Sequence, residues 1–216
     1  MFSIPNLLTA ANLSCGIAAI LLIQGDQIDI ALICLIGSLI FDLFDGYLAR
    51  LLNQQSDLGI QLDSFADLIS FGLAPSFFLY YQCKEELGLW SCVCFIMCIL
   101  AAFRLARFNV KTDGLPNDFE GMPSPMAALF VMGLFILPEH FNISTLVYPT
   151  TAIGIGICMV STFPVLKFKP SLAWAKKHPL LIFLIVGSIV SSFYLKSLSL
   201  SLLVIGFSLY SLIKKK

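Results

Sequence analysis

Charged side chains are scarce in this sequence of 216 residues. They make up 12% of the chain, hydrophobic residues make up 58%, and the mean hydropathy is +0.92. Soluble proteins average about 25% charged residues. The scarcity of charge excludes an ordinary soluble domain and predicts an all-α, polytopic membrane protein.

Metal-binding cysteine motifs are also missing. Cys92, Cys94 and Cys98 do not have the usual zinc spacing and have no histidine nearby. We therefore interpret the cysteines as small, packed, reduced thiols. The net charge is zero, so overall charge indicates no class of partner, and we expect no nucleic acid to bind.

Long apolar runs, in contrast, fill the chain. A membrane-spanning helix needs about 20 residues, and about eight runs qualify as candidates, some of them marginal in length. They lie at 5–23, 28–49, 60–81, 87–108, 122–138, 143–163, 179–195 and 197–213. In the fifth and sixth runs, Gly133, Gly154 and Gly156 indicate close helix packing.

The basic residues predict the orientation in the membrane. If the turn after the second run faces the cytoplasm, all 13 basic residues except Lys84 and Lys196 fall on the cytoplasmic side. This bias is typical of the positive-inside pattern. Both termini are then expected in the cytoplasm, on the cytoplasmic membrane of a prokaryote.

The acidic residues gather in one stretch, residues 41–67. Its skeleton is Asp42-x2-Asp45-Gly46-x2-Ala49-Arg50-x8-Gly59-x3-Asp63-x3-Asp67. Residues three or four apart share a helix face, so two helices could direct four carboxylates at one another. Eight fixed positions, each matched by chance at roughly 5–8%, give on the order of 10⁻¹⁰ per start site. A solvated helix face does not explain this stretch.

Four carboxylates inside a membrane protein predict a bound cation. On insertion scales each costs roughly 2.5–3.5 kcal/mol, and a divalent cation would offset that cost. All-oxygen ligation suits Mg²⁺ or Mn²⁺, with Ca²⁺ as a further option, and four carboxylates have room for two ions. We expect Asp42, Asp45, Asp63 and Asp67 to hold the metal.

The same skeleton resembles the signature of the CDP-alcohol phosphatidyltransferases at every position. The similarity extends over about the first 130 residues. Ile4–Gly16, Ser64–Ser76, Arg104–Val110 and Phe119–Ala128 are similar to the integral-membrane phosphatidylserine synthases of that family. The resemblance implies a catalytic core at 1–165, a basic loop with two further helices at 166–216, and a homodimer.

The resemblance also implies substrates and residue roles. Phosphatidyl transfer from CDP-diacylglycerol to L-serine would use Asp67 as general base, with Arg50 at the nucleotide phosphates. The expected contacts of the CDP-lipid are Asn6, Thr9, Asp42, Gly46, Ala49, Arg50, Ser56 and Gly59. The expected contacts of serine are Arg104, Arg107, Asn109 and Glu120.

Other functions compete with this interpretation. Another member of the family would use glycerol 3-phosphate, an inositol phosphate or phosphatidylglycerol as acceptor, and an archaetidylserine synthase would use an ether-linked donor. An acceptor with a phosphate should need more basic residues than Arg104 and Arg107. An ion-coupled transporter should distribute its carboxylates through the membrane depth, whereas here they cluster beside Arg50.

Overall fold

The structure, a computed structural model, describes residues 3–110, 119–135, 144–161 and 164–165. These residues form a helix bundle with one antiparallel pair of two-residue strands, β1 (Phe119–Glu120) and β2 (Pro164–Val165). The helical fold class is thereby confirmed. The runs at 179–195 and 197–213 lie outside the described residues, so the expected number of eight spans is not tested.

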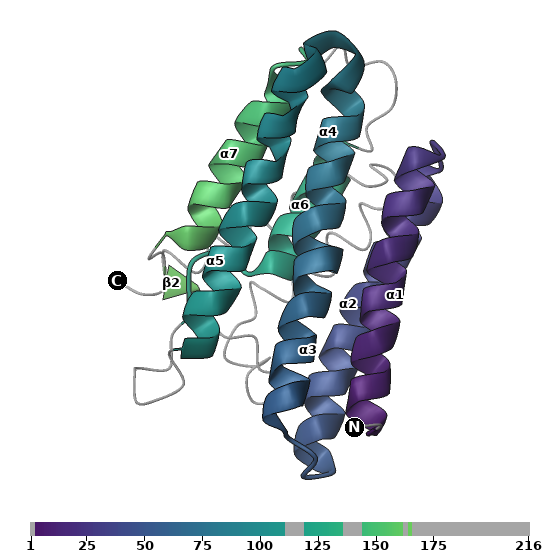
Figure 1. Cartoon of the computed structure of the whole chain (residues 1–216), viewed down its shortest axis with the longest axis vertical. Coiled ribbons are helices and arrows are strands. Elements are labelled where there is room, and N and C mark those ends of the chain that lie inside the picture. The colour runs from purple at the N-terminus through teal and green to yellow at the C-terminus, as the bar shows by residue number, and fades with distance from the viewer. Residues whose placement is uncertain (1–2, 111–118, 136–143, 162–163, 166–216) are drawn as a thin grey trace, which may run out of the picture.

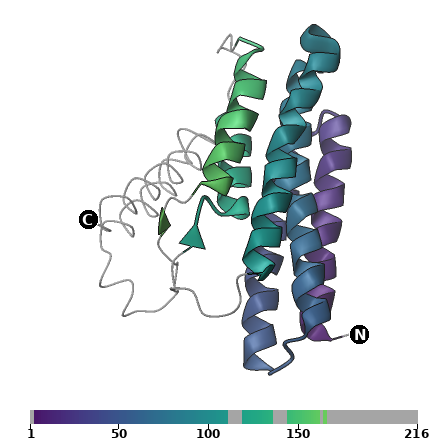
Figure 2. The same cartoon turned by 60° about the vertical axis from the view of Figure 1, so that its left-hand side comes forward.

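Helices α1 (Ile4–Gln24) and α2 (Ile28–Leu51) match the first two predicted runs closely. Ser3 caps α1 by accepting a hydrogen bond from the Asn6 N–H, and Pro5 lies in the first turn, where its missing N–H costs nothing. The two helices lie side by side, as Figures 1 and 2 show.

The third predicted run is interrupted by a π-helix. α3 (Asp57–Asp67) continues into the π-helical η1 (Leu68–Leu73) and then into α4 (Ala74–Leu87). Pro75 lies in the first turn of α4. The π-helix therefore lies on the N-terminal side of Pro75, and π-helical turns often mark functional sites.

Gly88 reverses the chain at the far end of the bundle. Its φ of +54° is a left-handed conformation that glycine adopts without a steric cost. The 3₁₀-helical η2 (Gly88–Phe95) and then α5 (Ile96–Val110) lead back along the bundle.

The bundle is completed by α6 (Ser124–Phe135) and α7 (Val147–Val160). A Cβ added at Gly156 would lie 2.6 Å from Leu100 Cδ1, so this glycine allows α7 to pack closely on α5. A Cβ at Gly154 would meet no atom of the described residues within 4 Å, so the packing role expected there remains a prediction.

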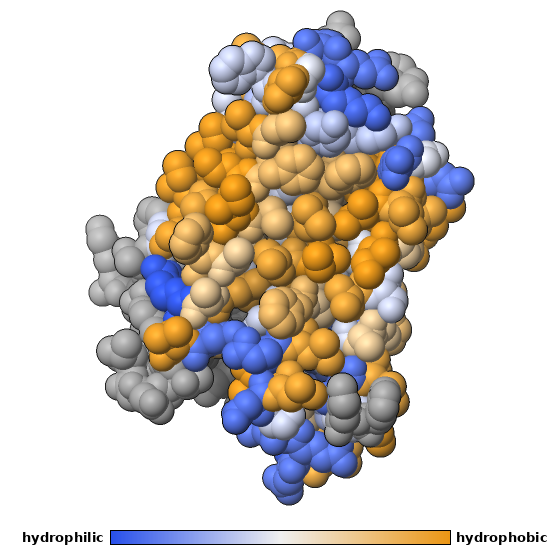
Figure 3. All heavy atoms as spheres, viewed as in Figure 1, coloured by the Kyte–Doolittle hydropathy of each residue, from blue (hydrophilic) through white to orange (hydrophobic). Residues whose placement is uncertain are grey.

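A broad apolar band crosses the middle of one face of the described bundle, between two ends rich in polar residues (Figure 3). Exposed apolar side chains such as Leu21, Ile33 and Ile99 contribute to the apolar surface. By length and composition, Ile4–Gln24 and Asp57–Val110 could cross a membrane. A continuous apolar surface of this kind fits a lipid environment better than water.

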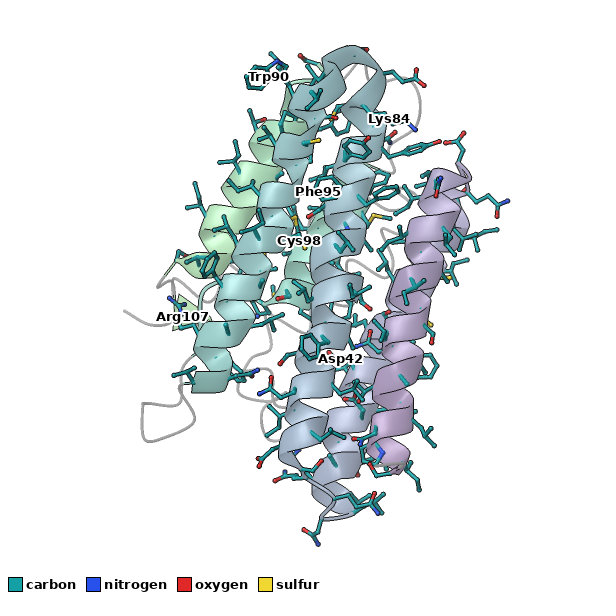
Figure 4. The ribbon with its side chains drawn as sticks, viewed as in Figure 1. Asp42, Lys84, Trp90, Phe95, Cys98 and Arg107 are labelled. Carbon is teal, nitrogen blue, oxygen red and sulfur yellow. The ribbon has the colours of Figure 1, made fainter. Side chains whose placement is uncertain are left out.

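Different chain segments and charged residues lie at the two ends of the bundle. The start of α1 and the turn between α2 and α3 lie at one end, and the Gly88 turn lies at the other (Figure 1). In Figure 4, Asp42 and Arg107 lie in the half nearer the first end, whereas Lys84 and Trp90 lie near the second.

Candidate active site

Three carboxylates from α2 and α3 meet inside the bundle. One carboxylate oxygen from each of Asp42, Asp63 and Asp67 lies within 4.8 Å of the other two, and the three side chains are half-buried. The spacing places Asp63 and Asp67 one turn apart on α3, and Asp42 faces them from α2. We call these three residues the acidic cluster.

The acidic cluster fits a hard divalent cation. Oxygen ligands at this separation repel one another unless a cation lies between them, and carboxylates are the ligands that Mg²⁺, Mn²⁺ and Ca²⁺ prefer. In addition, Asp63 Oδ1 is buried and has no hydrogen-bond partner among the described residues. An unpartnered acceptor of this kind is available to a metal.

Asp45 is not among the carboxylates whose oxygens lie within 4.8 Å of one another, but its charge interacts with those of Asp42, Asp63 and Asp67. Its side chain is 4% exposed, and its Oδ2 accepts a 2.6 Å hydrogen bond from the Thr9 hydroxyl. Its expected role as a metal ligand remains a prediction.

A cavity of about 280 Å³ opens where the start of α1, the end of α2 and the start of α3 meet. Among the residues expected to contact the CDP-lipid, Asn6, Thr9, Gly46, Ala49, Arg50, Ser56 and Gly59 line it. Asp42 does not line it, but Asp63 does, so the cavity borders the acidic cluster. We call it the nucleotide cavity because of the residues that line it.

Two polar residues that line the cavity, Gln54 and Gln55, were not among the expected site residues. They belong to the polar turn between α2 and α3. Two adjacent amides in a turn between two acidic helices were the signal available in the sequence.

Local geometry explains how α3 begins at the cavity. Ser56 caps the helix by accepting a 3.1 Å hydrogen bond from the Gly59 N–H. A Cβ at Gly59 would lie 3.2 Å from both Asn6 Oδ1 and Ser56 Oγ, so the absence of a side chain lets α3 approach α1. A Cβ at Gly46 would meet no atom within 4 Å, so this position faces the open cavity.

The buried side chain of Asn12 contacts Asp67. The Asn12 amide donates a long hydrogen bond of 3.5 Å to Asp67 Oδ1. The hydroxyls of Ser38 and Ser70 lie 2.8 and 3.1 Å from the Asn12 backbone oxygen and donate to it. Asn6, Thr9 and Asn12 recur at every third residue of α1, but Asn12 was not among the expected site residues.

The expected serine contacts separate into different places. Arg104 is buried, its Nη1 donates a 3.0 Å hydrogen bond to Ser124 Oγ, and its charge interacts with that of Asp67. Arg107 Nη1 donates to the Val160 backbone oxygen of α7, and Asn109 Nδ2 donates to Ser64 Oγ. Glu120 belongs to β1. Among the contacts given for these side chains, the charge interaction of Arg104 with Asp67 is the one that involves the acidic cluster.

Comparison with known proteins gives one consistent result. A family model described as CDP-alcohol phosphatidyltransferase matches residues 2–163. The CDP-diacylglycerol–serine O-phosphatidyltransferase of Helicobacter pylori is 34% identical over 175 residues, 78% of this chain and 74% of that protein. Proteins of the same name from Methanocaldococcus jannaschii and Bacillus subtilis are each 36% identical, over 78% and 77% of this chain and 79% and 88% of their own lengths.

Proposed function

Because the chain belongs to the CDP-alcohol phosphatidyltransferase family, we propose that it transfers a phosphatidyl group from CDP-diacylglycerol to L-serine. The products are phosphatidylserine and CMP. The observation that carries the proposal is the nucleotide cavity, which borders three carboxylates whose oxygens lie within 4.8 Å of one another. The choice of L-serine as the acceptor follows from the names of the relatives.

The nucleotide cavity would hold the CDP portion of the donor. Its walls offer amide, hydroxyl and guanidinium groups from Asn6, Thr9, Ser56 and Arg50. Arg50 can bind phosphate oxygens through two parallel N–H donors. Gly46 leaves the space that a bulky ligand needs against the backbone of α2.

The acidic cluster would lie at the diphosphate. Asp42, Asp63 and Asp67 would hold a divalent ion, Mg²⁺ or Mn²⁺, which would supply positive charge to the phosphates and to the departing CMP. We expect two ions, with Asp45 as a further ligand. The half-buried carboxylates provide a rigid oxygen cage, because α2 and α3 each contribute at least one of them.

Asp67 would activate the acceptor. A serine hydroxyl is a weak nucleophile near neutral pH and needs a base within hydrogen-bond reach. As the serine oxygen bonds to the phosphatidyl phosphorus, its proton passes to the Asp67 carboxylate, and the bond from phosphorus to the CMP oxygen breaks. Asn12 fixes the orientation of this carboxylate.

The proposed location is the cytoplasmic membrane, with the site facing the cytoplasm and both termini on that side. The apolar band supports insertion in a bilayer (Figure 3). The acidic cluster lies toward the end that carries Arg50 and Arg107, whereas Lys84 lies at the other end (Figure 4). Membrane lipid surrounds the bundle, and a homodimer is expected from the family resemblance.

The test is CMP release by the purified protein in detergent with CDP-diacylglycerol and Mn²⁺ or Mg²⁺. L-serine, glycerol 3-phosphate and an inositol phosphate are compared as acceptors. The proposal predicts release that depends on serine. Release of CMP with a different acceptor would support the proposed site but rule out serine as the acceptor. Folded protein that binds CDP-lipid but releases no CMP with any acceptor would overturn the proposed transferase activity.

A further inference from the structure

Ser38 of α2 and Ser70 of η1 donate hydrogen bonds to the same acceptor, the backbone oxygen of Asn12 in α1. The two distances are 2.8 Å and 3.1 Å, and the two hydroxyl oxygens lie 3.2 Å apart. All three residues are fully buried. A single carbonyl group inside the bundle therefore connects three helical elements. We call the two serines together with this carbonyl the serine clamp.

The hydrogen bonds of the serine clamp differ from those that helix serines usually form. A serine hydroxyl inside a helix commonly donates to the carbonyl oxygen four residues earlier in the same helix. Ser14, Ser64 and Ser76 follow this pattern. Ser38 and Ser70 instead donate across to α1. Their hydroxyls therefore join neighbouring helices, whereas the other three bond within one helical turn.

The serine clamp lies close to the acidic cluster along both chain segments that supply the carboxylates. Ser38 lies about one helical turn before Asp42 in α2. Ser70 follows Asp67 within one turn, where α3 continues into η1. Asn12 also contacts Asp67 with its side chain, at 3.5 Å. The separation of α2 from α3 at the carboxylates therefore depends on hydrogen bonds made one turn away.

We propose that the serine clamp positions the carboxylates of the acidic cluster and thereby sets the size of divalent ion that they prefer. This inference rests on the proposed function, in which the acidic cluster holds a metal ion. Three carboxylates repel one another before an ion binds, and this repulsion pushes α2 away from α3. Two hydrogen bonds to one carbonyl of α1 oppose the separation, so the carboxylate oxygens stay within 4.8 Å of one another. Ser38 and Ser70 are positioning residues that act through the carboxylates.

The separation of the carboxylates matters because divalent ions differ in size and in the geometry that they accept. Mg²⁺ requires nearly octahedral oxygen ligands at about 2.0–2.1 Å, whereas Ca²⁺ accepts flexible geometries at about 2.3–2.6 Å. Carboxylates that are held close together suit the smaller ion. Without the serine clamp the carboxylates can move apart, and affinity for Mg²⁺ is lost before affinity for Ca²⁺. The serine clamp therefore favours Mg²⁺ over Ca²⁺.

The test measures ion affinities of the full-length protein in detergent, without substrate. Mn²⁺ is titrated first, and its displacement by Mg²⁺ or by Ca²⁺ is followed through the electron paramagnetic resonance signal of free Mn²⁺. Ser38→Ala and Ser70→Ala each remove one hydrogen bond and should weaken Mg²⁺ binding about fivefold, and the double variant should weaken it more than about tenfold. Ca²⁺ affinity should stay within about twofold in all three variants, so the preference for Mg²⁺ falls.

Ser76→Ala is the matched control. Its hydroxyl is also fully buried, but it donates at 2.8 Å to the Gly72 oxygen of the preceding helical turn. This variant should leave the affinities for both ions unchanged. The melting temperature without metal is recorded for each variant, because a general loss of stability lowers the affinities for Mg²⁺ and Ca²⁺ equally. If Ser38→Ala does not fold, Ser38→Cys replaces it, since a thiol is only a weak hydrogen-bond donor.

An unchanged ratio of Mg²⁺ to Ca²⁺ affinity in the double variant would overturn the inference, whether both affinities stay the same or fall equally. Failure of the proposed function is a different result, in which the unmodified protein binds Mn²⁺ but releases no CMP with serine. Unmodified protein that binds none of the three ions would overturn both.

Discussion

Two glycines at the nucleotide cavity have opposite surroundings. Gly59 faces protein, since a Cβ there would lie 3.2 Å from atoms of Asn6 and Ser56. Gly46 faces open space, since a Cβ there would meet nothing within 4 Å. A methyl group at Gly59 would disturb the contact between α3 and α1, whereas a methyl group at Gly46 would disturb only a ligand that enters the cavity.

Gly46→Ala therefore tests the cavity without disturbing the fold. We expect the KM for CDP-diacylglycerol to rise about tenfold, equivalent to 1.4 kcal/mol, while the melting temperature in detergent stays unchanged or rises. Titration of CMP release against the donor measures the effect. Gly154→Ala, at another glycine with no neighbour within 4 Å, is the control. Equal donor KM values for Gly46→Ala and the unmodified protein would show that the ligand does not approach α2 here.

Asp67→Asn tests the general base. Loss of the base should lower kcat by at least about 10²-fold, the lower bound for general base catalysis. CDP-lipid binding, measured by equilibrium dialysis with a labelled donor, should be largely retained. Loss of binding with normal turnover per bound donor would contradict the role.

For single residues, the sequence predicted most of the acidic side chains that meet, but not the side chains that form hydrogen bonds with them. Helical spacing placed Asp42 and Asp45 on one stripe and Asp63 and Asp67 on the facing one. The structure brings three of these four carboxylates, Asp42, Asp63 and Asp67, within 4.8 Å of one another. Spacing does not show that Asp45 accepts a hydrogen bond from Thr9. Nor does it show that Asn12 contacts Asp67, because that contact depends on how closely α1 and α3 approach.

The π-helix η1 packs against α1 next to Asn12, the residue that contacts Asp67. It follows Asp67 directly and places Ser70 against α1, where its hydroxyl donates to the Asn12 backbone oxygen. This approach requires Gly16, because a Cβ at that position would overlap the Ser70 side chain and lie 2.8 Å from the Ser70 Cα. Close packing at Gly16 thus keeps Asn12 at Asp67.

Gly16→Ala should separate α1 from η1. Overpacking costs typically 1–3 kcal/mol, so we expect a lower melting temperature in detergent together with a reduced kcat. The matched variant Gly154→Ala changes an exposed helix glycine and should not destabilise the protein. A melting temperature equal to that of the unmodified protein would mean that the helices are not packed as described.

The helix bounds could be predicted from the sequence in part. The ends of α1 and α2 follow from apolar length and from the cap at Ser3. The irregularity near Pro75 could be expected, but its form could not, since a π-helix depends on packing against α1 and α5 as much as on proline.

In the part of the chain that the structure describes, an apolar band lies between two polar ends (Figure 3). Asp57 and Glu85 are exposed at opposite ends, at the start of α3 and near the Gly88 turn. The orientation in a membrane that the basic residues indicate remains a prediction. The two last predicted spans lie outside the described residues.

Cysteine labelling in intact cells tests the orientation. We expect a membrane-impermeant maleimide to label Glu85→Cys in intact cells but Asp57→Cys only after lysis, each compared with the unmodified chain and its seven native cysteines. The reverse pattern would place the site on the outer face of the membrane.

The most direct test of the central claim is Mn²⁺ binding to the purified protein, measured by titration calorimetry together with serine-dependent CMP release. The account predicts that Asp42→Asn and Asp63→Asn each weaken Mn²⁺ binding at least about tenfold and lower CMP release in parallel, because both carboxylates belong to the acidic cluster. Asp57→Asn, which changes an exposed aspartate at the start of α3, should bind and turn over like the unmodified protein. Folded Asp42→Asn and Asp63→Asn variants with unchanged Mn²⁺ affinity would contradict the account.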